Sequence, residues 1–133
     1  MSRARRLVGV TVALGGGDLL TGLGLIAIPG SVLRSLGIDL ALYPTELLGW
    51  LGAFVAGVGA ATLYPLALGG AWRERLAVVL EATALIRYAV AAYLAASMLR
   101  GVLPTAWWSV ALYDAAAATL QLAWLRPEAL RGA

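Results

Sequence analysis

The stretch LAVVLEATALIRYAVAAYLAASML, residues 76–99, decides how this chain folds. It is almost wholly apolar over 24 residues, and a helix needs about 20 such residues to cross a hydrocarbon core about 30 Å thick. Three further stretches share its length and character, namely residues 7–28, 46–68 and 104–125. The sequence therefore predicts an all-α integral membrane protein, a four-transmembrane-helix bundle that forms one domain over residues 1–133.

The composition of the 133-residue chain excludes an ordinary soluble fold. Hydrophobic residues make up 62% of it and charged residues 13%, whereas soluble domains are near half apolar and about a quarter charged. A domain of this size buries only about two-thirds of its surface, so it cannot hide so many apolar side chains from water. The chain has no Cys and no His, so disulfides, thiolate metal sites and Cys–His catalysis are excluded, and no metal or cofactor is expected.

The arginines predict the orientation of the bundle. Seven of them fall at one end of the predicted spans and two at the other, while Arg87 lies inside a span. The seven are Arg3, Arg5, Arg6, Arg73, Arg75, Arg126 and Arg131, and the two are Arg34 and Arg100. Because basic residues concentrate in cytoplasmic loops, we expect both termini to be cytoplasmic. No basic patch with interleaved aromatic residues indicates nucleic-acid binding.

The N-terminal stretch has two interpretations. A basic start at residues 3–6 followed by apolar residues is also the pattern of a signal peptide. The apolar run continues to Ile28, however, which is spanning length and favours a helix that stays in the membrane. The lack of Lys, His and Asn beside frequent Ala, Gly, Leu and Arg is typical of a GC-rich bacterial genome. The predicted location is therefore the bacterial inner membrane.

Small residues predict where the helices approach closely, because helices in lipid associate through close backbone contact. The second stretch carries two parallel rows of them, and the first stretch carries Gly15 and Gly22. The rows are Gly49, Ala53, Gly57 and Ala61, and Gly52, Ala56 and Ala60. We expect both rows to pack against neighbouring helices.

The connections carry two further signals. Between the first two spans, the sequence predicts a short helix with Ser31 as N-cap and Gly37 as the residue that ends it. Six aromatic residues near the span ends are predicted to anchor the bundle at the membrane interfaces. They are Tyr43, Trp50, Tyr64, Trp72, Trp107 and Trp124.

Three charged residues fall near the middle of the predicted spans: Asp18, Arg87 and Asp114. Each costs roughly 2.5–3.5 kcal/mol at a helix centre unless it finds a partner or water. All three lie at one depth, so we expect them to face inward as a cluster. The planar fork of an arginine can bridge two carboxylates, which satisfies its donors and neutralises most of the charge.

Such a cluster has a structural interpretation and a functional one. The structural interpretation is a buried ion network that fixes the register of the helices. The functional interpretation is a site for general acid and base catalysis on a lipophilic substrate, with Asp18, Asp114, Arg87 and Glu81 as catalytic residues. The predicted substrate-binding residues are Thr21, Tyr88, Tyr93, Trp107, Tyr113 and Gln121. Epoxide opening, double-bond isomerisation and terpenoid cyclisation all suit this set.

The order acid, Arg, acid resembles the Asp, Arg, Asp constellation of limonene epoxide hydrolases, which are soluble and have another fold. A transport role is the further alternative, in which the buried carboxylates relay protons or bind an ion. The orientation bias and the absence of two inverted halves in the sequence weigh against it.

A second resemblance covers roughly the first half of the chain. Gly22-Leu23-Gly24 through Pro29, then Leu33, Leu36-Gly37-Ile38 and a Gly-rich second span, resembles the DoxX-like small four-helix membrane proteins. This resemblance implies a non-catalytic subunit or assembly factor, because such proteins often accompany redox systems. The expected partners are then the bilayer and either further copies of the chain or a larger membrane complex, whereas the enzyme hypothesis requires a lipophilic small molecule.

Overall fold

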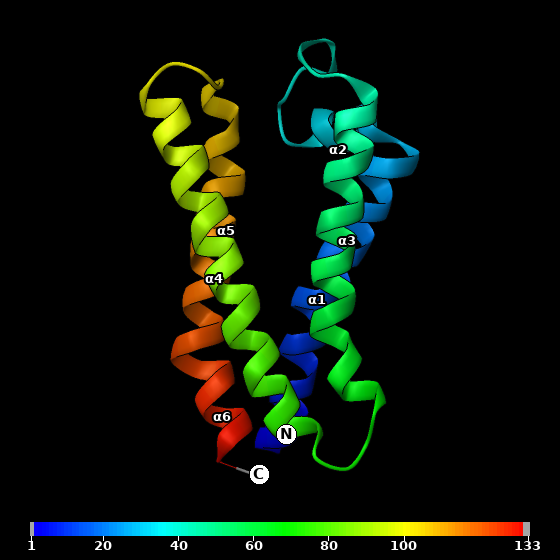
Figure 1. The fold of residues 1–133 in the computed structure, drawn as a ribbon, viewed down its shortest axis with the longest axis vertical. Helices are drawn as coiled ribbons and strands as arrows, with labels where there is room; N and C mark the ends of the chain where they lie inside the picture. Colours follow the sequence, from blue (N-terminus) through cyan, green and yellow to red (C-terminus); the bar gives the residue numbers. More distant parts are fainter. Residues whose placement is uncertain (1, 132–133) are drawn as a thin grey trace.

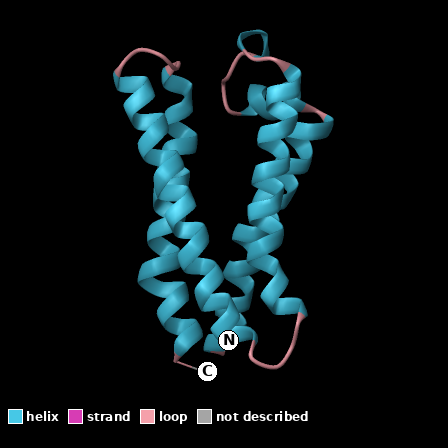
Figure 2. Cartoon of the chain, viewed as in Figure 1, coloured by secondary structure: helices cyan, strands magenta, loops and turns pink. Residues whose placement is uncertain are grey.

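A computed structural model describes residues 2–131, and this part of the chain contains helices and loops but no strand (Figure 2). The longer helices are α1 (Arg3–Ala27), α3 (Thr45–Ala67), α4 (Trp72–Leu99) and α5 (Trp108–Leu120). The shorter ones are α2 (Pro29–Ser35), α6 (Arg126–Leu130), the 3-10 helices η1 (Leu40–Leu42) and η2 (Thr105–Trp107), and the π-helical η3 (Gln121–Leu125). The prediction of an all-α chain is confirmed.

The helices α1, α3 and α4 are long and apolar enough to cross a membrane. Both α1 and α4 begin four residues before the predicted spans, because their first turns carry the arginines of the polar end. The segments α5, η3 and α6 follow one another without a break from Trp108 to Leu130 and cover the fourth predicted stretch. Large apolar side chains such as Leu20 and Leu99 are exposed on the outside of the bundle, as a lipid environment favours.

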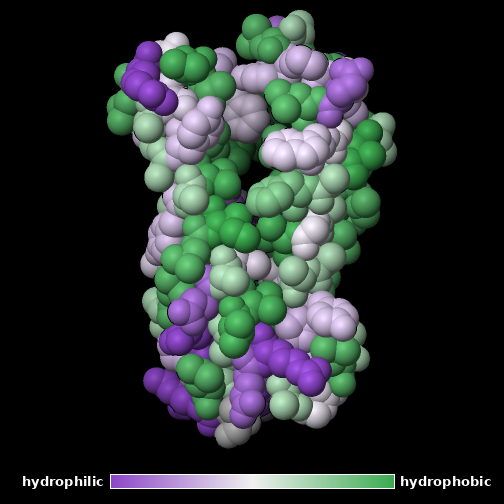
Figure 3. Space-filling view, viewed as in Figure 1, coloured by the Kyte–Doolittle hydropathy of each residue, from purple (hydrophilic) through white to green (hydrophobic). Residues whose placement is uncertain are grey.

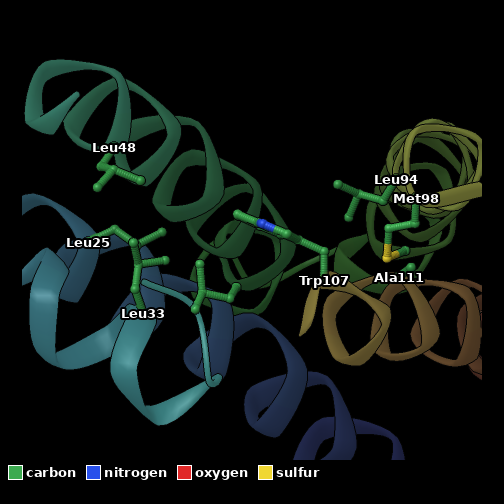
Figure 4. Packing of buried hydrophobic residues seen from close by; sticks show 8 residues of the cluster. Leu25, Leu33, Leu48, Leu94, Met98, Trp107 and Ala111 are labelled. Carbon is green, nitrogen blue, oxygen red and sulfur yellow. The ribbon is translucent and has the colours of Figure 1, made fainter. Parts of the chain in front are cut away.

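The helices are arranged as two pairs, α1 with α3 and α4 with α5, that lie close together at the end carrying both termini (Figure 1). A core joins the pairs at this terminal end: Leu7, Leu76, Ala77, Leu80, Leu125 and Ala129. Toward the other end the pairs separate, and Figure 3 shows the surface hollowed between them there. Beyond the hollow, Trp107 extends from the α4–α5 pair toward the α1–α3 pair (Figure 4).

Glycine packing between α1 and α3 holds the first pair together. A Cβ on Gly22 would lie 2.5 Å from the carbonyl oxygen of Gly52, and one on Gly59 would lie 2.5 Å from that of Gly15. The two backbones therefore touch, as small residues permit in lipid. The prediction was right for Gly52 and wrong for Gly49 and Gly57, because a Cβ built on either of these two would have no neighbouring atom within 4 Å among residues 2–131.

The short helix in the connection between α1 and α3 begins earlier than predicted but ends where predicted. The short helix α2 begins at Pro29 and not after Ser31, since the fixed φ of proline suits the first position of a helix. It ends as predicted, with Gly37 at a φ of 72°. There the amide of Ile38 donates to the carbonyl of Leu33 and the amide of Gly37 donates to that of Arg34, the pattern of a Schellman motif.

Candidate functional site

Three helices bring their charged residues together near the middle of the bundle. Asp18 comes from α1, Arg87 from α4 and Asp114 from α5. The Nη1 of Arg87 donates to Oδ1 of Asp114 at 2.6 Å, and its Nη2 donates to Oδ2 of Asp18. The predicted cluster of two carboxylates on one guanidinium is thus present. We call these three residues the Asp–Arg–Asp network.

The network is buried, but not uniformly. The side chains of Arg87, Asp18 and Asp114 are 5%, 8% and 14% exposed. Asp114 is therefore the member nearest to the surroundings of the bundle. Two carboxylates and one guanidinium carry one excess negative charge when all are ionised, so a single proton taken up by either acid makes the network neutral.

An aromatic ring completes the surroundings of the guanidinium. The Cζ of Arg87 lies 5.6 Å from the ring centroid of Tyr113, within the range of a cation–π contact. Tyr113 precedes Asp114 on α5 and is about half exposed, so its ring borders both Arg87 and the outside of the bundle. Within residues 2–131, the Nε of Arg87 has no hydrogen-bond partner and is buried.

A second polar contact lies nearer the terminal end. The Nε2 of Gln121 donates to Oγ1 of Thr83 at 3.1 Å, and that hydroxyl in turn donates to the carbonyl of Val79. Gln121 is completely buried, and its Oε1 lacks a partner among the described residues. Thr11 is buried as well, and its hydroxyl has no hydrogen-bond partner within residues 2–131. The sequence could have indicated that Thr11 is buried, because it lies seven residues before Asp18 and residues at this spacing share one helix face.

Glu81 is not part of the network. Its Oε2 accepts a hydrogen bond from Nε of Arg126 at 2.9 Å, and both side chains are substantially exposed. The reason is helix geometry, because six residues at about 100° each turn Glu81 about 120° away from Arg87. Glu81 thus lies apart from the network, and its catalytic role stays a prediction.

The predicted substrate-binding residues are distributed over three regions. Tyr113 lies at the network, and Gln121 lies nearer the terminal end. Trp107 is buried in a second apolar cluster that includes Leu25, Leu48 and Met98, and there its Nε1 donates to the hydroxyl of Tyr43 at 2.8 Å. Trp107 is therefore not an exposed interfacial anchor. The hydroxyl of Tyr88 shares a 2.8 Å hydrogen bond with Thr119 at the surface.

Thr21 and Tyr93 are exposed, in contrast to the polar interior expected for them. Tyr93 follows Arg87 by six residues, which turns it about 120° away from the charged residue. Thr21 follows Asp18 by only three residues, a turn of about 60°, and its side chain is nevertheless exposed. Their role in substrate binding stays a prediction, and their exposed positions do not support it.

Apart from the hollow between the helix pairs, two further surface hollows are described, and neither is lined by the Asp–Arg–Asp network. One of about 590 Å³ follows the outside of α5, and one of about 220 Å³ lies between the two chain ends. Among residues 2–131 no three acidic side chains gather as a group that could hold a metal ion.

Together these features define a small multi-span membrane protein with a buried Asp–Arg–Asp network. No protein-family model matches the chain, and neither the curated proteins nor the solved structures compared with it contain a match. The fold and the chemistry of the network therefore carry the functional argument.

Proposed function

We propose that this protein is a membrane-embedded acid–base enzyme that acts on a lipophilic substrate at the Asp–Arg–Asp network. The observation that carries the proposal is the pair of carboxylates from different helices, Asp18 and Asp114, held on one guanidinium. Ionisable groups inside a membrane are costly, so their presence usually marks a functional site. Here they are also oriented, because each carboxylate is bound to a separate nitrogen of Arg87.

The exposure of the three residues suggests a division of roles. Asp114, the most exposed, is positioned to give a proton to the oxygen of an epoxide or to an alkene carbon. Asp18 is positioned to accept a proton from an attacking water or from the substrate, and Arg87 holds both acids in place. In epoxide opening, water adds one hydroxyl to a carbon while the protonated oxygen becomes the second hydroxyl, so the product is a diol. The Tyr113 ring beside Arg87 offers an aromatic face to developing positive charge.

The hollow between the helix pairs supports access for such a substrate. The surface is indented between the pairs on the side away from the termini (Figure 3). An apolar molecule dissolved in the lipid would enter the bundle between the helix pairs from this space.

In the proposed enzyme the chain crosses the membrane four times. We propose that α5, η3 and α6 together form the fourth span, which their unbroken course from Trp108 to Leu130 supports. Both termini lie at the arginine-rich end, which is then the cytoplasmic side of a bacterial inner membrane.

The test uses the purified full-length chain in lipid nanodiscs with a panel of terpenoid epoxides and alkenes, limonene oxide included. Products are followed by gas chromatography with mass spectrometry. Asp114→Asn and Asp18→Asn should each lower turnover by about 100-fold or more, because general acid–base groups contribute roughly 10²–10⁴. Asp39→Asn is the matched control, since that exposed carboxylate only caps η1. A wild-type protein that leaves every member of the panel unchanged overturns the proposal.

A non-catalytic subunit or assembly factor is the competing function, as the resemblance to DoxX-like proteins implies. One observation favours it: the hollow on α5 and the basic hollow near Arg3 both lie away from the network. The network would then serve to join α1, α4 and α5. Co-purification of a larger complex in mild detergent, together with unfolding of Asp114→Asn and Asp18→Asn, would support this alternative.

A further inference from the structure

A basic pocket lies where the two ends of the chain meet. It has a volume of about 220 Å³ and is lined by Arg3 and Arg6 of α1, Trp124 of η3, and Glu128 and Arg131 at the C-terminal end. The carboxylate of Glu128 is largely buried and accepts a hydrogen bond from Nη1 of Arg131 at 3.2 Å. Three guanidinium groups and one carboxylate leave this pocket with a net charge of +2.

The arginines at the beginning of α1 are in an unfavourable position unless an anion lies beside them. A helix N-terminus carries a partial positive charge and favours acidic side chains. The first turn of α1 has no acidic residue, and it carries Arg3, Arg5 and Arg6 instead. An anion bound between Arg3 and Arg6 would offset both the like charges and the dipole of this 25-residue helix.

An apolar groove continues from the same tryptophan. The groove, of about 590 Å³, runs along the outside of α5 from Leu112 past Ala116 and Thr119, and continues on η3 to Trp124. Leu112 and Trp124 are twelve positions apart, a helical rise of about 18 Å, which is close to the roughly 15 Å thickness of one membrane leaflet. Trp124 therefore belongs to both hollows, one basic and one apolar.

We propose that the two hollows form one binding site for an anionic phospholipid. Its phosphate is held by Arg3, Arg6 and Arg131, and one acyl chain lies along the groove on α5. The ring of Trp124 lies at the level where glycerol and phosphate meet the hydrocarbon, a position that tryptophan favours. Glu128 is a positioning residue, because its hydrogen bond directs Arg131. Basic pockets beside transmembrane helices are a known mode of binding for anionic headgroups.

The apolar groove distinguishes this ligand from free phosphate. A soluble anion would use the guanidinium groups alone and would leave the groove on α5 unfilled. The pocket also differs from the general excess of arginine at this end, since Arg73 and Arg75 do not line it. The guanidinium of Arg73 lies over the Trp72 ring at 5.0 Å instead.

Native mass spectrometry of the full-length chain in detergent measures the binding directly. The probes are phosphatidylglycerol and phosphatidylcholine with identical acyl chains, and inorganic phosphate as the soluble anion. We expect one phosphatidylglycerol per chain, saturable, with phosphatidylcholine and phosphate bound at least about tenfold more weakly. Each arginine that donates a hydrogen bond to the charged phosphate contributes at least about a fivefold gain in affinity. Arg3→Gln with Arg6→Gln should therefore weaken binding at least about 25-fold.

Two further variants keep the proposal falsifiable. Arg73→Gln with Arg75→Gln removes the same charge outside the pocket and should change binding less than about threefold, because detergent presents no charged membrane surface. Ala116→Phe fills the groove at an exposed position without altering charge, and it should also weaken binding. If both double arginine variants lost the same affinity for phosphatidylglycerol, the binding would depend only on net charge, and the proposed pocket would be overturned. Equal binding of phosphatidylcholine, or displacement of phosphatidylglycerol by phosphate at equal concentration, would overturn the lipid site.

Discussion

Gly59 of α3 lies directly against Asp18 of α1: a Cβ built on the glycine would be 3.0 Å from the Cβ of the aspartate. The same Cβ would be 2.5 Å from the carbonyl oxygen of Gly15 and still closer to the amide nitrogen of Leu19. The glycine contact between α1 and α3 therefore fixes where the first carboxylate of the Asp–Arg–Asp network stands.

Gly59→Ala should separate α1 from α3 and destabilise the bundle by roughly 1–3 kcal/mol, because the added methyl group meets rigid backbone. Gly57→Ala is the matched control, since nothing lies within 4 Å of a Cβ at that position. It should leave stability unchanged or raise it by up to about 1 kcal/mol through higher helix propensity. Thermal unfolding in detergent compares the two variants. Equal behaviour of the two would contradict the assigned packing of α1 on α3.

Arg87→Gln should cost about 3–5 kcal/mol, because it leaves two buried carboxylates without their cation. Arg126→Gln breaks the exposed pair with Glu81, whose side chain is 51% exposed, and should cost no more than about 1 kcal/mol. Chemical denaturation followed by circular dichroism measures both. Adding Asp18→Asn and Asp114→Asn to Arg87→Gln should restore much of the lost free energy of unfolding. If the triple variant were as unstable as Arg87→Gln alone, unpaired charge would not be the cause of the instability.

Tyr43→Phe should destabilise the outer end of the bundle by about 0.5–1.5 kcal/mol, since it removes the acceptor of the Trp107 indole N–H. The edge-to-face packing of the two rings, with centroids 5.8 Å apart, is retained in this variant. Tyr64→Phe removes a hydroxyl from a residue that is 62% exposed and should have no measurable effect. Tryptophan fluorescence during unfolding reports on both, and identical transitions would show that the hydrogen bond contributes nothing.

Gln121→Leu should change stability by less than about 1 kcal/mol or increase it, because the buried Oε1 has no partner within residues 2–131. Thr83 keeps its hydrogen bond to the Val79 carbonyl when the amide of Gln121 is removed. A loss of turnover with unchanged stability would place Gln121 at a bound substrate, as the sequence predicts. A strongly destabilised variant would instead show that the amide is structurally required.

The membrane-spanning helices were predictable because their signal is local. An apolar run such as residues 76–99 must form a helix in lipid, where each backbone N–H and C=O group needs a partner within the segment. The depth of Asp18, Arg87 and Asp114 follows from counting along each run, and three charges at one depth can be accommodated only together. The network could therefore be predicted as a set.

The sequence by itself determined the helices, their apolar surfaces and the need for the three buried charges to meet, because these follow from the cost of polar groups in hydrocarbon. Only the tertiary structure decided which rows of glycine touch, since Gly52 and Gly49 are chemically equal and differ only in the side of α3 that carries them. It also decided that Glu81 pairs with Arg126, and that Arg3, Arg6 and Arg131 converge beside Trp124. Such contacts join residues far apart in the chain, and their geometry depends on how the helices rotate against one another rather than on any local pattern.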